Sequence, residues 1–322
     1  MPTLRRIRSF IAVCEEASFT AAAARERATQ SGISQHVKKL EAELGVPLFE
    51  RDRGDVRLTT AGRLYYGQCV DVLRRLDAAQ QRVAANRVLG SIRIGLMPTF
   101  TRSVLSPALA QFLEQSPESE IHIVEAYSGV LTDMVVKGEL DFAVVPSFEG
   151  VPGISHQLLA RDCETLVSAR QGKIRNIRPI RLRDRGPLKI IVPGPQNTRR
   201  RNIETYFTSN GVTVSQRLEL DAMMGTLQFI AASDWIAILP FLMMVSDLDE
   251  GRYDIRALED PAMYADFILI QPARKALTPA AALFANMLKH ETEQAQKIFH
   301  ERVKEAAAII HRKPQKQVKN AG

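Results

Sequence analysis

SFTAAAARERA (residues 18–28) followed by TQSGISQHVKKLEAELGVPLFER (residues 29–51) decides the fold of the N-terminal part of this chain. Apolar residues recur in the second segment at spacings of four, three and four, which predicts a helix with one buried stripe, made of Ile33, Val37, Leu40 and Leu44. The opposite face is polar and carries Gln30, Ser31, Ser34, Gln35 and Lys38. Thr29 is placed to cap this helix through its hydroxyl group.

The first segment predicts a shorter helix whose alanines, Ala21 to Ala24, let another helix approach closely. Such a tight helix pair is what a helix-turn-helix needs, with the second helix offering hydrogen-bonding side chains to base edges in the major groove. An alanine-rich helix pair with a solvated polar face is, however, also common in helical proteins that bind no DNA.

The residues after Leu44 favour the DNA-binding interpretation. Gly45 ends the helix, and two short apolar–polar runs around Asp52-Arg53-Gly54-Asp55 predict a small hairpin, or wing. Arg51, Arg53 and Arg57 are candidates for phosphate contacts, although the neighbouring acidic residues are equally typical of a solvated turn.

From Leu4 to about Gly62 the chain resembles the DNA-binding end of LysR-type transcriptional regulators. The runs FIAVCEEASFTAAAA, LEAELGVPLFER and LTTAG carry this resemblance. Three residues of the second helix depart from the family pattern: Ser31 stands where proline is frequent, Gly32 where alanine is, and Gln35 where arginine is. These departures concern which bases are recognised and leave the expected fold unchanged.

The resemblance implies an α/β protein with an N-terminal winged helix-turn-helix, a long linker helix and a two-lobed effector domain like a periplasmic binding protein. We expect the DNA-binding domain at 1–59, a dimerisation helix at 60–90, the effector domain at 91–297 and a helical extension with a basic tail at 298–322. Within the effector domain, lobe one is expected at 91–161 and 268–297, and lobe two at 162–267.

Composition is consistent with a globular protein of two or three domains. The 322 residues are 45% hydrophobic and 25% charged. No run approaches the roughly 20 apolar residues of a membrane span, and the N-terminus lacks the apolar segment of a signal peptide, so we expect a cytoplasmic protein without membrane contact. The net charge of +7 is not concentrated in the first sixty residues, so the motif, and not the charge, indicates DNA binding.

Motifs for catalysis, cofactors and metals are missing from the sequence. Cys14, Cys69 and Cys163 are far apart and form no metal-binding spacing. There is no G-x-S-x-G, H-E-x-x-H or phosphate-binding glycine loop. We therefore expect neither an enzyme nor a bound cofactor or metal.

A long helix is predicted to begin at Thr59 or Thr60, in a stretch without proline before Pro98. Apolar residues follow one another there at alternating spacings of four and three: Tyr65, Cys69, Val72, Leu76, Ala79, Val83 and, as a polar member, Asn86. This heptad pattern predicts a coiled-coil seam between two subunits of a homodimer, with a dimer of dimers as a further possibility. The alternative is an amphipathic helix that lies on its own domain.

From about Ser91 the pattern changes to alternating strands and helices, which predicts a parallel sheet with right-handed crossovers. Ligands of such sheets bind beyond the carboxyl ends of the strands. The residues at these ends are Thr99, Thr101 and Ser128 in lobe one, and Asn197 and Thr198 in lobe two. The resemblance assigns Thr99 and Ser128 to effector contacts, although either can be a helix cap. Arg199-Arg200-Arg201 suggests an anionic small-molecule effector, although surface solvation is the more typical fate of at least two of the three.

The predicted function is a sequence-specific DNA-binding transcriptional regulator that responds to a small-molecule effector. One alternative is a DNA-binding protein whose second domain is unresponsive. Another is a solute-binding protein or enzyme built on the same two lobes, which the missing export signal and catalytic motifs disfavour.

Overall fold

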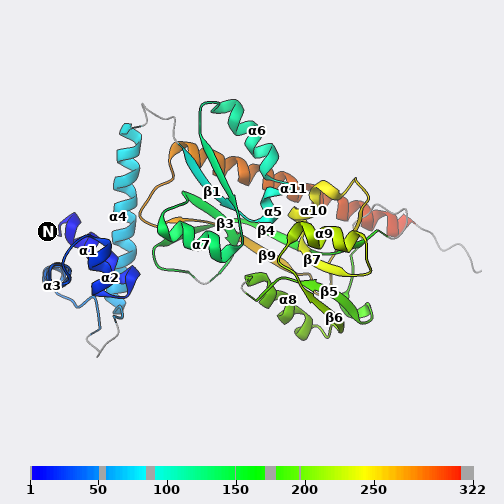
Figure 1. The fold of residues 1–322 in the computed structure, drawn as a ribbon, viewed down its shortest axis with the longest axis horizontal. Helices are drawn as coiled ribbons and strands as arrows, with labels where there is room; N and C mark the ends of the chain where they lie inside the picture. The colour runs from blue at the N-terminus through cyan, green and yellow to red at the C-terminus, as the bar shows by residue number, and fades with distance from the viewer. Residues whose placement is uncertain are drawn as a thin grey trace, which may run out of the picture. The chain divides into compact units, whose positions relative to one another are not determined.

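The computed structural model describes residues 2–50, 56–84, 91–148, 150–170, 179–195 and 197–312. The chain forms two compact units. The first comprises Met1–Val88 with two loops, Glu149–Ser155 and Gln271–Thr278, and the second comprises the remainder. Each unit has its own hydrophobic core. Figure 1 shows the helices and strands of the chain.

The first unit begins with three helices, α1 (Leu4–Glu16), α2 (Phe19–Arg25) and α3 (Gln30–Leu44). Each helix starts at a hydroxyl cap: Thr3, Ser18 and Thr29 accept hydrogen bonds from the backbone N–H groups of Arg6, Ala21 and Gly32. These caps satisfy amides that the helices cannot pair internally. The predicted cap at Thr29 is therefore confirmed.

The core of this unit contains the predicted stripe of α3. Ile33, Val37 and Leu40 are buried, and Leu44 packs against them half-buried. Ala22 and Ala23 of α2 are also buried, which allows the close approach expected of a helix-turn-helix. Gly45 ends α3 with φ of 72°, a left-handed conformation that glycine adopts without strain.

A wing follows α3. Phe49 and Leu58 form an antiparallel bridge, and the Glu50 N–H donates to the Arg57 carbonyl at 2.8 Å. The predicted hairpin is thus present at its base. Its tip, with Arg51 and Arg53, lies outside the described residues.

The linker helix is α4 (Thr60–Ala84), and its apolar face differs from the predicted seam. Cys69 is buried in the core of the same chain, and the Tyr65 ring lies 5.5 Å from that of Phe10. These two residues are therefore not available to a second subunit, which corrects the predicted register. The side chain of Val83 and all of Asn86 fall outside the described residues.

The second unit contains lobe one, which we define as β1, β2, β3 and β9 with α5, α6, α7 and α11. The bounds are β1 Ile92–Leu96, α5 Pro98–Thr101, α6 Leu105–Gln115, β2 Ile121–Glu125, α7 Ser128–Lys137, β3 Phe142–Pro146, β9 Tyr264–Pro272 and α11 Pro279–Arg312. Strand β1 pairs in parallel with β2 and β3, and β3 pairs antiparallel with β9. Phe112 of α6 packs edge-on against Phe284 of α11 in the core.

Lobe two consists of β4 to β8 with α8 and α9. The bounds are β4 Ile154–Ala169, β5 Leu188–Val192, α8 Thr198–Ser209, β6 Val214–Glu219, α9 Met223–Ala231, β7 Ile236–Pro240 and β8 Tyr253–Ala257. Strand β5 pairs in parallel with β6 and β7, whereas β4 pairs antiparallel with β7 and β8. Strands β9 and β4 are neighbours in the sheet order, which connects the lobes.

The sheet is therefore mixed and not parallel throughout as predicted. The two strands that cross between the lobes, β4 and β9, run antiparallel to their partners. Repeated strand–helix–strand units predict parallel pairing only among β1, β2 and β3 and among β5, β6 and β7. Among the described residues, no helix is both long and apolar enough to cross a membrane.

A short buried helix, α10 (Phe241–Met244), and a 3-10 turn, η3 (Val245–Asp247), were not predicted from the sequence. They follow β7 of lobe two, yet α10 contacts α5 and α11 of lobe one (Figure 1). The Asp162 carboxylate of β4 accepts a hydrogen bond from the Leu242 N–H at 2.8 Å and so caps α10. This segment joins the two lobes.

Candidate functional site

The polar face of α3 is accessible. Gln30, Ser31, Gln35 and Lys38 are exposed and Ser34 is half-buried, while the opposite stripe packs into the core. Two turns of amide, hydroxyl and ammonium groups therefore point away from the domain. Side chains of this kind form hydrogen bonds with base edges and phosphates in a major groove.

A polar contact joins α3 to α1. The hydroxyl of Ser9 lies 2.8 Å from Nδ1 of His36, and Ser9 is buried. Burial lowers the pKa of His36, and the positive charges of Arg5, Arg6 and Lys39 lower it further. The neutral ring is therefore favoured, and it links α3 to α1 without adding a positive charge.

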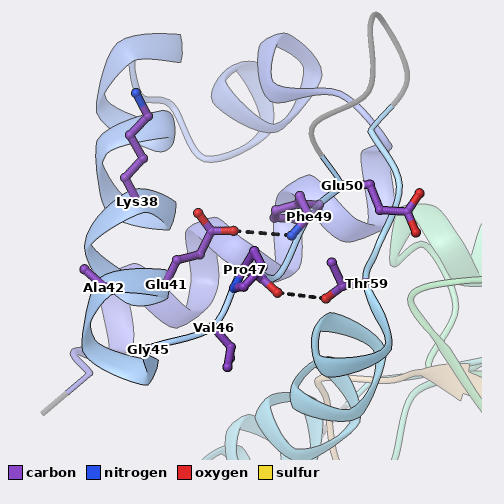
Figure 2. A pocket seen from close by; sticks show the side chains of 9 residues that line it. All are labelled: Lys38, Glu41, Ala42, Gly45, Val46, Pro47, Phe49, Glu50 and Thr59. Carbon is purple, nitrogen blue, oxygen red and sulfur yellow. Dashed lines mark hydrogen bonds between the residues drawn. The ribbon is translucent and has the colours of Figure 1, made fainter.

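Glu41 links α3 to the wing, a role that was not predicted. Its Oε1 accepts hydrogen bonds from the backbone N–H groups of Leu48 at 2.7 Å and Phe49 at 3.3 Å, and Figure 2 shows the second of these. At the other side of the loop the Thr59 hydroxyl donates to the Pro47 carbonyl at 2.8 Å. The sequence feature that could have predicted this role of Glu41 is its position one helical turn before Gly45, which ends the helix.

These contacts border a surface hollow of 910 Å³ between the end of α3, the wing base and the start of α4. The Lys38 ammonium extends from α3 away from Glu41 (Figure 2). It is therefore free of that carboxylate and can contact a phosphate from the exposed face of the helix.

A second cavity, of 530 Å³, lies in the second unit where strands of both lobes end. We call it the cleft cavity. It is lined from lobe one by Pro98, Thr101, Arg102, Glu125, Ala126 and Tyr127, and from lobe two by Asp221, Ala222, Met223 and Met224. These residues follow the carboxyl ends of β1, β2 and β6, the position at which α/β sheets bind ligands.

Of the five predicted effector residues, only Thr101 lines the cleft cavity. Its hydroxyl donates to Oε2 of Glu125. Thr99 and Ser128 are buried beside it at the first turns of α5 and α7, and Ser128 Oγ has no hydrogen-bond partner among the described residues. Ser128 is thus a hydroxyl that its own domain does not satisfy.

Asn197 and Thr198 do not line the cleft cavity. The Asn197 side chain accepts from the Arg199 N–H at 3.1 Å and caps α8, whereas Thr198 is exposed. Lobe two instead contributes the loop that connects β6 to α9. This loop contains no motif, so it could not be recognised from the sequence.

Two of the three consecutive arginines are paired with carboxylates of their own lobe. Arg199 is buried and forms two hydrogen bonds with the buried Glu164 carboxylate, and Arg200 contacts Glu204 and Glu219. None of the three arginines lines the cleft cavity, so they give no support to an anionic effector there. The charged residues that line the cleft cavity are Glu125, Asp221 and Arg102, of which Arg102 is paired with Asp247.

Tyr127 connects the two sides of the cleft cavity. Its hydroxyl, from lobe one, donates to the backbone carbonyl of Asp221, from lobe two, at 2.5 Å. Burial raises the pKa of Tyr127, and the charges of Asp221 and Glu125 raise it further, so the phenol stays protonated and keeps this donor. Within the described parts of the chain, no group of three or more His, Cys, Asp and Glu side chains is arranged to hold a metal.

Two family models match the chain. Residues 4–63 match the bacterial regulatory helix-turn-helix proteins of the lysR family, and residues 85–293 match the LysR substrate binding domain. The nitrogen assimilation regulatory protein nac of Escherichia coli K12 is 26% identical over 88% of this chain and 93% of its own length.

Solved structures of full-length regulators share the fold. A mutant of Corynebacterium glutamicum OxyR, solved with bound hydrogen peroxide, matches with a TM-score of 0.56 at 21% identity, over 92% of this chain and 96% of that one. CbnR, solved in a complex with its target DNA, matches with a TM-score of 0.52 at 22% identity, over 90% and 99%. The chain therefore belongs to the LysR family and is a DNA-binding transcriptional regulator with an effector-binding domain.

Proposed function

We propose that Gln30, Ser31, Ser34 and Gln35 contact bases while Lys38 contacts phosphate. The observation that carries this assignment is the division of α3 into a buried apolar stripe and an exposed polar face. The first four residues project from the early turns, which in helix-turn-helix proteins contact base edges. Arg51 and Arg53 of the predicted wing, which lie outside the described residues, are proposed to add phosphate contacts.

A dimer is proposed to form through the outer face of α4. Leu64 and Val72 are 71% and 50% exposed. With the exposed Gln68 and Ala79 they lie on one side of the helix, at spacings of four, four and seven. Two such faces give a symmetric contact, so the DNA site should have two-fold symmetry. Pairs of dimers are a further proposed assembly.

The cleft cavity is proposed as the effector site, with Thr101 at its wall and the Thr99 and Ser128 hydroxyls behind it. Because Glu125 and Asp221 line the cavity and the arginines of α8 do not, the proposed effector is a small polar molecule that presents hydrogen-bond donors or positive charge to these carboxylates. An effector that prefers one arrangement of the lobes shifts their population and thereby changes DNA binding.

The chain is proposed to act in the cytoplasm by binding alone, without catalysis. Its proposed domains are residues 1–59, 60–90, 91–297 and 298–322. The decisive experiment is to sequence the genomic DNA that the purified protein retains. A two-fold symmetric motif near a small set of genes supports the proposal, and the products of those genes indicate candidate effectors. Retention of DNA without any shared motif would contradict sequence-specific binding.

A further inference from the structure

The contact between Arg102 and Asp247 joins the two lobes next to the cleft cavity. Arg102 follows α5 in lobe one and lines the cavity. Its Nη2 donates to Oδ1 of Asp247 at 2.7 Å. Asp247 ends η3, which enters from lobe two, and its side chain is only 1% exposed. Beside this pair the hydroxyls of Ser103 and Ser246 lie 3.3 Å apart.

Only one of the two parallel hydrogen bonds that an arginine and a carboxylate can form is present in this ion pair. Among the described residues, Nη1 of Arg102 and Oδ2 of Asp247 are buried without a hydrogen-bond partner. Arginine and carboxylate groups commonly form two parallel bonds, and a buried polar atom without a partner is costly. The two unpaired atoms are a donor and an acceptor on the same two side chains. A displacement of η3 relative to α5 that brings these two atoms together would give the pair its second hydrogen bond.

The helix that precedes η3, α10, contacts elements of both lobes, so a displacement of η3 can affect both. Helix α10 contacts α5 and α11 of lobe one, while Asp162 of β4 caps its first turn. Met243 and Met244 pack into the core of lobe two. Movement of η3 therefore moves elements of both lobes, and Arg102 connects that movement to the cleft cavity.

We propose that Arg102 is a positioning residue that couples occupancy of the cleft cavity to the arrangement of the lobes, by changing between one and two bonds to Asp247. This inference rests on the proposed effector site. A group that enters the cavity displaces the Arg102 guanidinium, and the gain or loss of the second bond favours one lobe arrangement.

The test measures the distance between the lobes in the full-length chain, with spin labels at Val136→Cys in α7 and Ser209→Cys in α8, both exposed positions. The native thiols are inert by comparison: burial raises the pKa of Cys163 to about 12, and it also raises the pKa of Cys14 and Cys69. An excess of unlabelled protein restricts the signal to distances within one chain.

Arg102→Gln and Asp247→Asn should reduce the population at the wild-type distance at least twofold. Arg102→Lys keeps the positive charge and one hydrogen bond to Asp247, so its population at the wild-type distance should stay close to that of the wild type. Asp234→Asn breaks the exposed pair with Lys189 inside lobe two and is the matched control, with no expected change. If Arg102→Gln and Asp247→Asn lower the melting temperature but leave the distances unchanged, the pair is only structural and the inference fails.

Coupling to the cavity is tested with Ala222→Trp, which places a bulky side chain in the cavity from lobe two without any need for the effector. This change should shift the mean lobe distance, and the shift should fall by at least half in Arg102→Gln. Additive shifts would overturn the coupling. Because these measurements use neither DNA nor effector, their failure is distinct from a failure of the proposed function. Both Arg102→Lys and Ala222→Trp also remain informative if Asp247→Asn does not fold.

Discussion

The guanidinium of Arg199 holds the carboxylate of Glu164 with two hydrogen bonds, of 3.0 and 2.7 Å, and both side chains are buried. The pair joins the first turn of α8 to β4 inside lobe two. A third bond, from Arg199 to the Ile238 carbonyl, extends it to β7 at 3.0 Å. Three elements of the lobe thus depend on one arginine.

Glu164→Gln leaves this buried guanidinium without its counter-charge. We expect the free energy of unfolding of the second unit to fall by about 3–5 kcal/mol, the usual cost of breaking a buried ion pair. Chemical denaturation followed by circular dichroism measures it. The exposed pair of Lys189 and Asp234 provides the control, because Asp234→Asn should leave the transition in place. Equal behaviour of the two variants would contradict this account.

Asp162 predicts a pH dependence of stability. Burial raises the pKa of its carboxyl from 3.8 to about 8, even though the N–H groups of Leu242 and Cys163 and the charge of Arg199 lower it. The unfolded chain loses this proton near the ordinary value, so from about pH 4 to about pH 8 the folded chain binds more protons. Stability should therefore fall as the pH rises through that window and change no further above it.

Asp162→Asn is the test of this sign. The amide keeps an acceptor for the Leu242 N–H but has no charge, so urea unfolding from about pH 5 to about pH 9 should become flatter than in the wild type. Asp162→Ala removes the acceptor and should destabilise the fold at every pH. A wild-type protein whose stability rises across this range would show that other groups dominate.

Gln35→Ala should cost about 1–3 kcal/mol of discrimination at one base position, because the side-chain amide can no longer pair with a base edge. Selection of bound sequences from a random library measures it. Lys38→Ala is the matched variant on the same face: it should weaken all sequences alike and reduce the salt dependence by about one ion. An unchanged sequence preference in Gln35→Ala would remove this residue from base recognition.

Val72→Asp should separate the subunits, since it places a carboxylate in the middle of the proposed outer face of α4. Analytical ultracentrifugation should show a smaller species, and DNA affinity should fall with it. Arg74→Ala lies on the other side of the same helix, in an exposed pair with Asp71, and should leave assembly intact. Normal assembly of Val72→Asp would place the subunit contact elsewhere.

Ser128→Ala should leave the folded protein as stable as the wild type or slightly more stable, because its buried hydroxyl has no partner to lose among the described residues. The same change should weaken effector binding by about 1–3 kcal/mol if the hydroxyl bonds to the ligand. Calorimetry with the effector and a thermal melt without it separate the two effects. Lower stability with unchanged affinity would make Ser128 a residue of the fold and not of the site.

The sequence by itself determined the features that depend on local spacing. The cap at Thr29, the stripe of Ile33, Val37 and Leu40, and the stop at Gly45 each involve residues within about one to three helical turns. The polar face of α3, the basis of the DNA-binding assignment, followed from this local pattern.

Only the tertiary structure decided which partners the side chains have. A heptad pattern states that Tyr65 and Cys69 are buried but cannot state against what, and they pack on their own chain. Arg199 was predicted to meet an anionic ligand, whereas Glu164, 35 residues away in the chain, neutralises it. The cleft cavity likewise combines loops that follow β1, β2 and β6. Contacts between distant segments depend on how the strands are ordered, and a periodic pattern in one segment carries no information about that order.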